Sequence, residues 1–319
     1  MSSEAVLVTG GAGFIGSHLV DALAAEGRFS VVVDNLSSGR RSFLKAAMAA
    51  GKARLQEQDL LTADLPGLLQ GCQSVVHAAA NPDVRLGATD PFVHFEQNVL
   101  VTSRLLHSMD AAGIREIVFL STSAVYGDAL TVPTPEDYSP MRPISLYGAS
   151  KLAAEFLIEA WARQGDRKAV VFRFANVVGG RATHGVIVDF VRKLKANPKE
   201  MEILGAPPGT SKSYVHIDDC IAGILAGWRK ASPPFTVYNV ASEGQTDVAR
   251  IAEVAAAQMG LKPEWRWTGG VDGGRGWKGD VRNMALDITR LSATGWRPRH
   301  PSERAVAEAV SNVLGKHYM

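Results

Sequence analysis

A tyrosine and a lysine four positions apart have the clearest capacity for chemistry in this chain. Tyr147 and Lys151 stand at the two ends of the run YGASK, where a stretch with helical spacing of apolar residues begins. On a helix this spacing places both side chains on one face. An ammonium beside a phenol favours the phenolate, so we expect Lys151 to lower the pKa of Tyr147 and make it a base near neutral pH. Thr122 and Ser123 add hydroxyls at the carboxyl end of a predicted strand, the edge at which open α/β sheets bind ligands.

A glycine-rich turn near the N-terminus has the spacing of a phosphate-binding loop. Gly10, Gly13 and Gly16 lie between a predicted strand and a predicted helix in TGGAGFIGS. Glycine permits the tight turn and lets the backbone approach a pyrophosphate, which then meets the helix N-terminus. Asp34 ends the second predicted strand, where an acid accepts the ribose hydroxyls of an adenosine and repels a 2′-phosphate. The pattern favours NAD over NADP.

Neighbouring residues leave other interpretations open. Arg40 and Arg41 offer cations to a 2′-phosphate. Asp34 has the alternative role of a helix or turn cap, and Asp59, after the third predicted strand, is as well suited to capping as to facing an adenine. His77 ends another predicted strand, and we expect it to be a packed or hydrogen-bonded core residue.

The elements that must position these residues alternate between strand and helix in the first half of the chain. Short apolar runs predict strands, and stretches with apolar residues at helical spacing separate them. This alternation is typical of βαβ units and of a parallel sheet with both faces buried. The predicted strands are 5–9, 30–33, 55–58, 74–78, 117–121 and 169–174, and the predicted helices are 17–26, 98–112 and 148–163.

Beyond Asn176 the alternation stops, and clusters of glycine and proline interrupt the chain. Helices are predicted at 186–196, 218–228, 247–259 and 302–313, and a strand at 237–240 that returns to the sheet. We expect an α/β fold, a Rossmann-type doubly wound parallel sheet with a smaller C-terminal α+β substrate lobe. The expected NAD-binding domain comprises residues 1–176 and roughly 213–241, and the lobe roughly 177–212 and 242–319.

Composition excludes several classes of protein. The 34 Lys and Arg against 32 Asp and Glu leave a net charge of +2, which gives no electrostatic reason to expect nucleic acid or an anionic membrane as partner. The apolar runs are strand-sized, well below a membrane span. Cys72 and Cys220 form no CxxC pair, which is typical of a reducing cytoplasm. No HxH, HExxH or cysteine cluster is present, so we expect no metal.

The ordered set of motifs resembles the extended short-chain dehydrogenases/reductases, in the group of nucleotide-sugar epimerases and dehydratases. The chain is most similar to the UDP-glucose (UDP-galactose) 4-epimerases, over essentially its whole length. The similarity is carried by TGGAGFIGSH at 9–18, DNLSSG at 34–39, DL at 59–60, HAAA at 77–80, Asn98, STSAVYG at 121–127, YGASK at 147–151, RFANVVG at 173–179, SYVHIDD at 213–219 and GW at 295–296.

The resemblance implies tightly bound NAD and a transient oxidation of the sugar. Tyr147 would remove the proton of the 4-hydroxyl while the C4 hydride passes to nicotinamide, and the 4-keto sugar would rotate and take the hydride back on its other face. Lys151 would bind the nicotinamide ribose, and Thr122 the reacting oxygen. The implied cofactor contacts are Gly10, Gly13, Phe14, Ile15, Gly16, Asp34, Asn35, Ser38, Gly39, Asp59, Leu60, Ala78, Ala79, Ala80, Asn98, Tyr147 and Lys151. The implied substrate contacts are Thr122, Ser123, Asn176, Lys212 and Arg275.

Departures from the family pattern bear on the reaction and on the substrate. The two residues after Thr122 are not acids, so elimination of water lacks its proton carrier, and epimerisation or ketone reduction remains. Lys212 stands where the family has Arg. A lysine neutralises the charge of a phosphate, but it cannot form the two parallel hydrogen bonds that a guanidinium makes. Trp277 replaces another family Arg, so Arg275 or Arg282 is expected to supply the missing cation.

The expected function is the interconversion of UDP-glucose and UDP-galactose by a cytoplasmic homodimer, whose helices 98–112 and 148–163 match the family's dimer segments. Two other functions of the same residues stay open: an NDP-4-ketohexose reductase, or an epimerase of UDP-N-acetylhexosamine, UDP-glucuronate, dTDP- or CDP-sugars. A third is a non-catalytic NAD-binding regulatory protein, although such proteins typically lose the Tyr or the Lys.

Overall fold

The computed structural model describes residues 5–315, and backbone contacts divide the chain into two compact units. The first unit comprises residues 5–122, 146–173 and 224–238, and the second comprises 123–145, 174–223 and 239–315. In the described part of the chain, no helix is long and apolar enough to cross a membrane.

The first unit is built on a seven-stranded sheet of order β3-β2-β1-β4-β5-β6-β11. The strands from β3 to β5 pair in parallel with their neighbours. The chain moves outward from β1 to β3 and then returns to the other side of β1. Sheets with such a switch point bind ligands at the carboxyl ends of the strands on either side of it, here β1 and β4. The strands are β1 (Ala5–Thr9), β2 (Phe29–Asp34), β3 (Ala53–Glu57), β4 (Cys72–His77), β5 (Glu116–Thr122), β6 (Lys168–Phe174) and β11 (Phe235–Val240).

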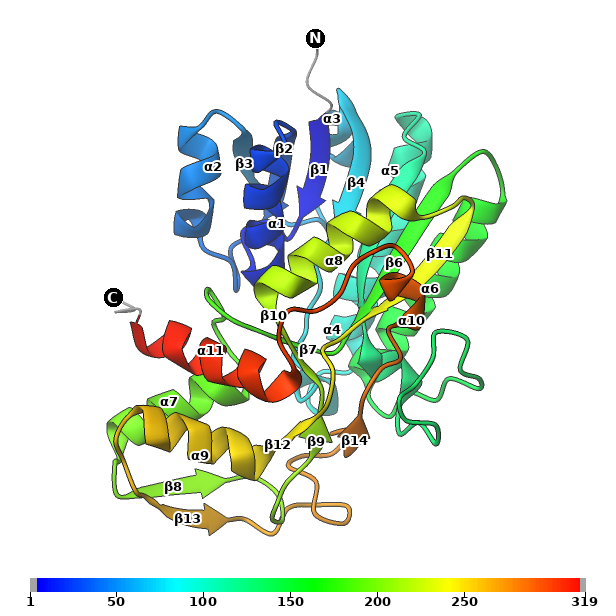
Figure 1. The fold of residues 1–319 in the computed structure, drawn as a ribbon. Coiled ribbons are helices and arrows are strands. Elements are labelled where there is room, and N and C mark those ends of the chain that lie inside the picture. The colour runs from blue at the N-terminus through cyan, green and yellow to red at the C-terminus, as the bar shows by residue number, and fades with distance from the viewer. Residues whose placement is uncertain (1–4, 316–319) are drawn as a thin grey trace. The chain divides into compact units, whose positions relative to one another are not determined.

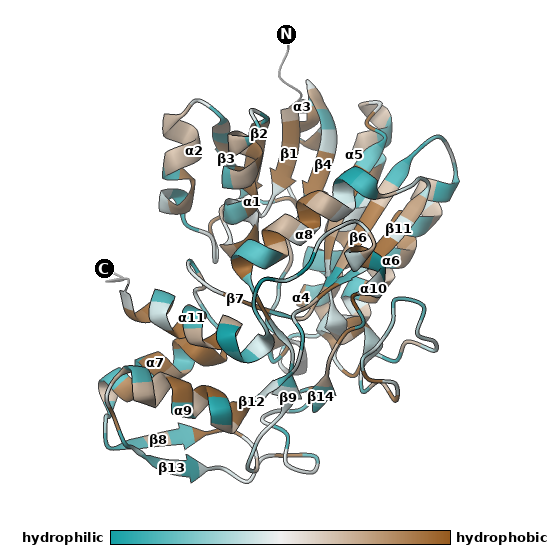
Figure 2. Ribbon diagram, in the orientation of Figure 1, coloured by the Kyte–Doolittle hydropathy of each residue, from teal (hydrophilic) through white to brown (hydrophobic). Residues whose placement is uncertain are grey.

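Helices cover both faces of this sheet (Figure 1). Alternate side chains of each strand enter opposite apolar layers: Leu7 and Val75 face one layer, and Val6 and Val76 face the other. Strands buried on both faces are apolar throughout, and Figure 2 colours β1 as hydrophobic along most of its length. One layer has α3 (Leu65–Leu69), α5 (Val101–Ala111) and α6 (Leu146–Arg163), and the other has α1 (Phe14–Ala25), α2 (Lys45–Ala49) and the second half of α8 (Ile217–Lys230). The short α4 (Phe92–His94) and a π-helical segment (Phe95–Leu100) precede α5.

The second unit combines helices with short strands around its own apolar cluster. Helices α7, α9 and α11 supply most of that cluster, and a parallel pair of strands, β8 and β13, packs against it. Further small sheets pair β7 with β10, and β9 with β12 and β14. The elements are β7 (Asn176–Val178), α7 (Val186–Ala196), β8 (Glu200–Ile203), β9 (Ser211–Lys212), β10 (Tyr214–His216), β12 (Thr246–Asp247), α9 (Val248–Gln258), β13 (Glu264–Trp267), β14 (Asn283–Met284), α10 (Thr289–Ser292) and α11 (Ser302–Gly315).

The predicted fold class is confirmed, and each predicted strand lies on an observed one with its ends displaced by at most two residues. The expected domains and the two units divide the chain differently: residues 123–145, 174–176, 213–223 and 239–241, expected in the NAD-binding domain, belong to the second unit. Side chains explain the first of these differences. The Asn239 side chain accepts a hydrogen bond from the Tyr126 hydroxyl at 2.7 Å and donates one to the Thr134 carbonyl at 2.9 Å. The backbone amide of Asn239 donates to the Glu136 carboxylate at 2.9 Å.

Candidate active site

The glycine loop connects β1 to α1, as its spacing predicts. Gly10 has a φ of 65°, in the left-handed region that favours glycine. A Cβ on Gly10 would lie 2.7 Å from the amide nitrogen of Ala79, so the segment after β4 packs directly on the loop. Gly13 is the N-cap of α1 and brings no side chain to bond the amides of the first turn, which leaves them for an anion. The loop therefore forms a cradle that fits a pyrophosphate. The first turn consists of Phe14, Ile15 and Gly16.

Asp34, at the end of β2, binds the backbone around the glycine loop. Its Oδ2 accepts a hydrogen bond from the Ala12 amide at 2.9 Å, and its Oδ1 accepts one from the Leu36 amide at 2.8 Å. Burial raises the pKa of this carboxyl, and the backbone donors lower it. A carboxylate has further lone pairs for ribose hydroxyls, so the structural contacts and the predicted ligand contact are compatible. Arg41 forms an ion pair with Glu57 at 3.2 Å.

The other predicted cofactor contacts lie where β2, β3 and β4 end. Asn35 donates from Nδ2 to Asp59 Oδ2 at 3.0 Å, which joins the ends of β2 and β3. Gly39 packs so closely on Asp34 that a Cβ would lie 2.8 Å from its Oδ1. Leu60 belongs to the apolar cluster, so its side chain packs in the core and only its backbone is left for a ligand. Ser38 is exposed, and Ala78, Ala79 and Ala80 follow β4.

Asn98 lies in the π-helical segment before α5 and joins two parts of the site. Its Oδ1 accepts a hydrogen bond from the Asn81 amide at 2.9 Å, and its Nδ2 donates to Ser150 Oγ at 2.9 Å. Ser150 Oγ donates to the Tyr147 carbonyl at 2.8 Å. Segments of π-helix are frequent at functional sites. This one connects the segment after β4 to the first turn of α6.

The three predicted catalytic side chains come together at the carboxyl end of β5. Tyr147 lies in the first turn of α6, and Lys151 follows one turn later. Thr122, the last residue of β5, makes a side-chain hydrogen bond with Tyr147. Lys151 is 2% exposed, and its ammonium lies 3.8 Å from the centre of the Phe119 ring. Within residues 5–315 no acceptor engages this ammonium, so it remains available to a ligand.

The protonation of Tyr147 and Lys151 differs from the expectation. Burial raises the pKa of Tyr147 to about 12, although the Thr122 hydrogen bond lowers it. Burial lowers the pKa of Lys151 to about 7, and the charge of Glu155 raises it. The predicted lowering of the Tyr147 pKa is therefore wrong for the protein alone, because loss of solvent around the phenol raises this pKa by more than the Thr122 hydrogen bond lowers it.

Two buried titratable residues beside these side chains were not recognised from the sequence. The ring of His94 lies 6.0 Å from the ring of Tyr147, and burial lowers the His94 pKa. Glu155, 2% exposed, lies one turn beyond Lys151 on α6. The repeated spacing of four residues from Tyr147 to Lys151 to Glu155 would have been the signal for Glu155. His94 has no comparable signal in the sequence.

In the second unit, the two basic residues predicted for the substrate are ion-paired. Lys212 Nζ lies 2.5 Å from Asp280 Oδ1 and 5.7 Å from the centre of the Trp277 ring. Arg275 donates from two nitrogens to the two carboxylate oxygens of Asp128, at 2.6 and 3.2 Å. Each cation is therefore oriented by a carboxylate of its own unit.

The remaining predicted substrate contacts are also placed within the second unit. Asn176 begins β7, and its side chain is hydrogen-bonded to Tyr214. Ser123 opens a turn of 3-10 helix, Ser123–Tyr126, and is half-buried. Arg282, the alternative cation, donates to the Asp272 carbonyl.

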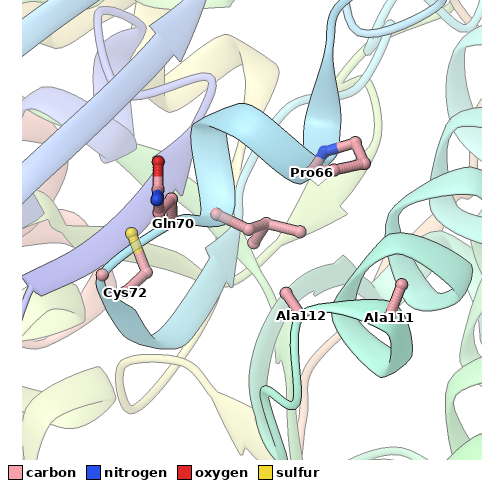
Figure 3. A pocket seen from close by; sticks show the side chains of 7 residues that line it. Pro66, Gln70, Cys72, Ala111 and Ala112 are labelled. Atoms are coloured by element: carbon pink, nitrogen blue, oxygen red, sulfur yellow. The ribbon is translucent and has the colours of Figure 1, made fainter.

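The first unit has a surface pocket of about 370 Å³, and Figure 3 shows the side chains that line it. Its lining includes Pro66, Gln70 and Cys72, at the amino end of β4, whereas the predicted site is at the carboxyl ends of the strands. Burial raises the pKa of the Cys72 thiol, which disfavours its nucleophilic thiolate form. Within residues 5–315 no group of three His, Cys, Asp or Glu side chains is placed to hold a metal ion.

Comparison with known proteins identifies the family. The sequence pattern of the NAD dependent epimerase/dehydratase family matches residues 6–241. A UDP-glucose 4-epimerase of Mycolicibacterium smegmatis is 33% identical over 314 residues, covering 95% of this chain and 96% of that protein. A crystal structure of a UDP-galactose 4-epimerase is 41% identical with a TM-score of 0.86, covering 98% of this chain and 100% of that one. The Thermotoga maritima UDP-glucose 4-epimerase, solved with UDP-glucose, is 31% identical with a TM-score of 0.86, covering 98% and 99%. The chain belongs to the NAD-dependent epimerase/dehydratase family.

Proposed function

We propose that the chain interconverts UDP-glucose and UDP-galactose at C4 of the sugar. Membership of the family makes NAD the cofactor. The observation that carries the proposal is the meeting of Thr122, Tyr147 and Lys151 at the carboxyl end of β5, the sheet edge at which the glycine loop also lies. Relatives and solved structures named as 4-epimerases of UDP-glucose and UDP-galactose support the choice of substrate.

Three side chains suffice for the proton transfers. Tyr147, as phenolate, accepts the proton of the C4 hydroxyl while C4 loses its hydride, and Thr122 holds the reacting oxygen. NAD⁺ supplies the chemistry of a reversible hydride acceptor when bound. Tyr147 returns its proton to O4 when the hydride re-enters C4 from the opposite face, so the reaction needs no further oxidant. Lys151 holds the cofactor ribose and favours the phenolate of Tyr147.

Tyr147 needs added positive charge to act as a base near neutral pH, because the protein alone raises its pKa to about 12. Two charges favour the phenolate: the Lys151 ammonium, and the oxidised nicotinamide ring when NAD⁺ is bound. The amino end of α6 supports an anion as well, since Tyr147 lies in its first turn.

The side chains after Thr122 favour epimerisation over loss of water. Ser123 and Ala124 hold no carboxylate, so a proton carrier for elimination is missing at this place. For the nucleotide diphosphate we propose Lys212 and Arg275, each already oriented by a carboxylate. We assign Ser123 and Asn176 to the substrate on the resemblance alone.

The test of this function needs no added cofactor. Purified protein is expected to release NAD on denaturation and to convert UDP-galactose into UDP-glucose without added NAD. Tyr147→Phe should lower kcat by about 10²–10⁴-fold, the usual contribution of general acid–base catalysis. Tyr138→Phe is the matched control, because the Tyr138 hydroxyl accepts a hydrogen bond from the Leu130 amide, outside the proposed machinery. Full turnover by Tyr147→Phe would contradict the mechanism, and activity restricted to dTDP-, CDP- or GDP-sugars in a panel would contradict the substrate.

We also propose that the enzyme is a homodimer. Apolar side chains are exposed on the segment before α5 and on α6, two of which are Phe92 (60% exposed) and Phe156 (54%). Exposed apolar patches of this kind mark interaction surfaces. They lie on or beside the two helical segments that the family resemblance assigns to the dimer.

A reducing cytoplasm is the compartment we propose for this enzyme. Cys72 and Cys220 are both buried free thiols, and burial raises the pKa of each. Thiols held in this way contribute as small apolar residues and form no disulfide.

A further inference from the structure

Helix α6 carries three ionisable residues in a row along one face. Tyr147, Lys151 and Glu155 are spaced by four residues, so each side chain lies one turn beyond the previous one. Side chains of a helix lean toward its N-terminus, which directs Glu155 toward Lys151 and Lys151 toward Tyr147. Lys151 and Glu155 are both 2% exposed. The proposed function uses the first two residues and leaves the buried carboxylate without a role.

Lys151 has little within the protein to stabilise its charge. The Phe119 ring of β5 lies beneath its ammonium, and an aromatic face attracts a cation only weakly. His77, at the end of β4, is neutral, because burial and the Lys151 charge lower its pKa to about 3. Tyr147 is neutral as well until it gives up its proton. Glu155 is the carboxylate whose charge supports the protonated lysine.

Glu155 is fixed from two strands and does not form a direct ion pair with Lys151. Arg173 of β6 donates from Nη2 to Oε2 at 2.7 Å, and its Nε lies 3.1 and 3.2 Å from the two carboxylate oxygens. Ser121 of β5 donates from Oγ to Oε1. Both oxygens are therefore occupied, and Glu155 would have to break these bonds to reach the ammonium. Ser121 also immediately precedes Thr122, so the same carboxylate joins α6 to the end of β5.

We propose that Glu155 is a positioning residue for the reaction. Arg173 and Ser121 hold its carboxylate in place, and the charge of that carboxylate keeps Lys151 protonated. Because Glu155 does not bind Lys151 directly, the ammonium stays free for the cofactor. A closer carboxylate would bind the ammonium directly and compete with the ribose. Without a carboxylate, the buried lysine would lose its proton and with it both the ribose hydrogen bonds and the support for the Tyr147 phenolate. The inference rests on the proposed function, because it assigns Lys151 the role that function gives it.

A buried ion pair with a purely structural role is the alternative explanation, and the titration of Lys151 separates the two. Removing half of a buried pair destabilises a fold in either case. Only the positioning role predicts that Lys151 gives up its proton at lower pH when Glu155 loses its charge, while the Arg173 guanidinium stays close and adds to the effect.

The experiment compares Glu155→Gln with the wild-type holoenzyme. Isotope-labelled lysine, with Lys151→Arg to assign the signal, gives the Lys151 titration by NMR, and the pH profile of UDP-galactose conversion gives the consequence. In Glu155→Gln we expect the Lys151 titration to move down by at least about one pH unit, and the alkaline limb of the activity profile to move down with it. Each unit of this shift corresponds to a loss of activity on that limb of about tenfold. Glu155→Asp, which keeps the charge, should recover part of this shift.

Two further measurements keep the proposal decisive. If Glu155→Gln does not fold, the double variant Glu155→Met with Arg173→Met replaces the pair by apolar side chains, a change that folds tolerate. A downward shift is again expected, smaller than in Glu155→Gln because the Arg173 charge is also gone. An unchanged Lys151 titration in either folded variant overturns the proposal. A wild-type enzyme inactive on every nucleotide sugar would overturn the proposed function instead, because the lysine titration is read without any substrate.

Discussion

At the scale of single residues, the structure separates glycines that close packing requires from glycines that only the backbone conformation favours. Gly10 and Gly51 share a φ of 65°. The neighbours of Gly10 leave no room for a Cβ, whereas nothing lies within 4 Å of that position at Gly51. The two glycines therefore form a matched pair in which only the close packing of the loop differs.

Gly10→Ala is expected to lose bound NAD, and Gly51→Ala to keep it. Each variant takes on the strain of a left-handed alanine, about 1–2 kcal/mol, and Gly10→Ala adds the clash with the segment after β4. Urea unfolding and the NAD content of the purified protein measure the two effects. Full NAD content in Gly10→Ala, with stability equal to that of Gly51→Ala, would show that the loop does not need its close approach.

Tyr147 shows what the spacing of residues leaves undetermined. The YGASK run correctly predicts that Tyr147 and Lys151 share a helix, and it misleads on the direction of the Tyr147 pKa. Spacing along one helix reveals which charges are near, whereas the shift also depends on how much solvent other elements exclude. That exclusion comes from residues distant in sequence, as does the Thr122 hydroxyl.

At the scale of elements, one buried histidine joins a strand pair to the helix that follows. The ring nitrogens of His77, at the end of β4, lie 2.7 Å from Thr9 Oγ1 and 3.0 Å from Thr102 Oγ1. Thr102 donates on to the Asn98 carbonyl at 2.6 Å. The predicted role of His77 as a hydrogen-bonded core residue is confirmed. The π-helical segment that contains Asn98 was not predicted, because its extra residue per turn leaves no mark in the apolar pattern.

The buried His77 makes stability depend on pH with a definite sign. Its pKa falls from 6.5 to about 3 on folding, so below pH 6.5 the unfolded chain takes up a proton that the folded chain refuses. His77 therefore contributes its full stability above that pH, and the protein loses up to about 1.4 kcal/mol per pH unit as the pH falls toward 3. Urea unfolding should show a shallower loss from pH 6 to 5 in His77→Gln than in the wild type. At pH 8 the free energies of unfolding of the wild type and His77→Gln should differ only by the contacts that the substitution removes. If the two free energies fall in parallel below pH 6, His77 is protonated in the native state.

At the scale of the whole molecule, the regular alternation of the first half made the sheet predictable, whereas the division into units was not. Strands covered on both faces must be apolar throughout, a signal that any single sequence carries. The assignment of residues 123–145 to the second unit depends on Asn239, a buried amide more than a hundred positions from the Tyr126 and Thr134 groups it bonds. The pairing of Lys212 with Asp280 also joins residues far apart along the chain, 68 positions from each other. Individual polar contacts of this kind follow no periodicity.

The dimer proposal belongs to the whole molecule and has a sharp test. The rings of Phe92 and Phe95 lie 5.3 Å apart on the surface of the first unit, whose helix α6 exposes Phe156 and Leu157. Sedimentation of the wild type is expected to show a dimer, and Phe156→Asp a monomer–dimer equilibrium at micromolar concentration. Burying a phenylalanine is worth about 1.5–3 kcal/mol, and a two-fold interface loses it twice, so the dissociation constant should rise by at least about a hundredfold.

The control for that test is an equally apolar residue outside the proposed surface. Leu130 is 95% exposed and belongs to the second unit, so Leu130→Asp changes surface hydrophobicity without touching α6. If exposed apolar area alone drove association, both variants would weaken the dimer. If α6 forms the interface, only Phe156→Asp will. A wild type that sediments as a monomer at all concentrations would contradict the homodimer, and the exposed phenylalanines would then have to bind another partner. A dimer unaffected by Phe156→Asp would mean that the interface lies elsewhere.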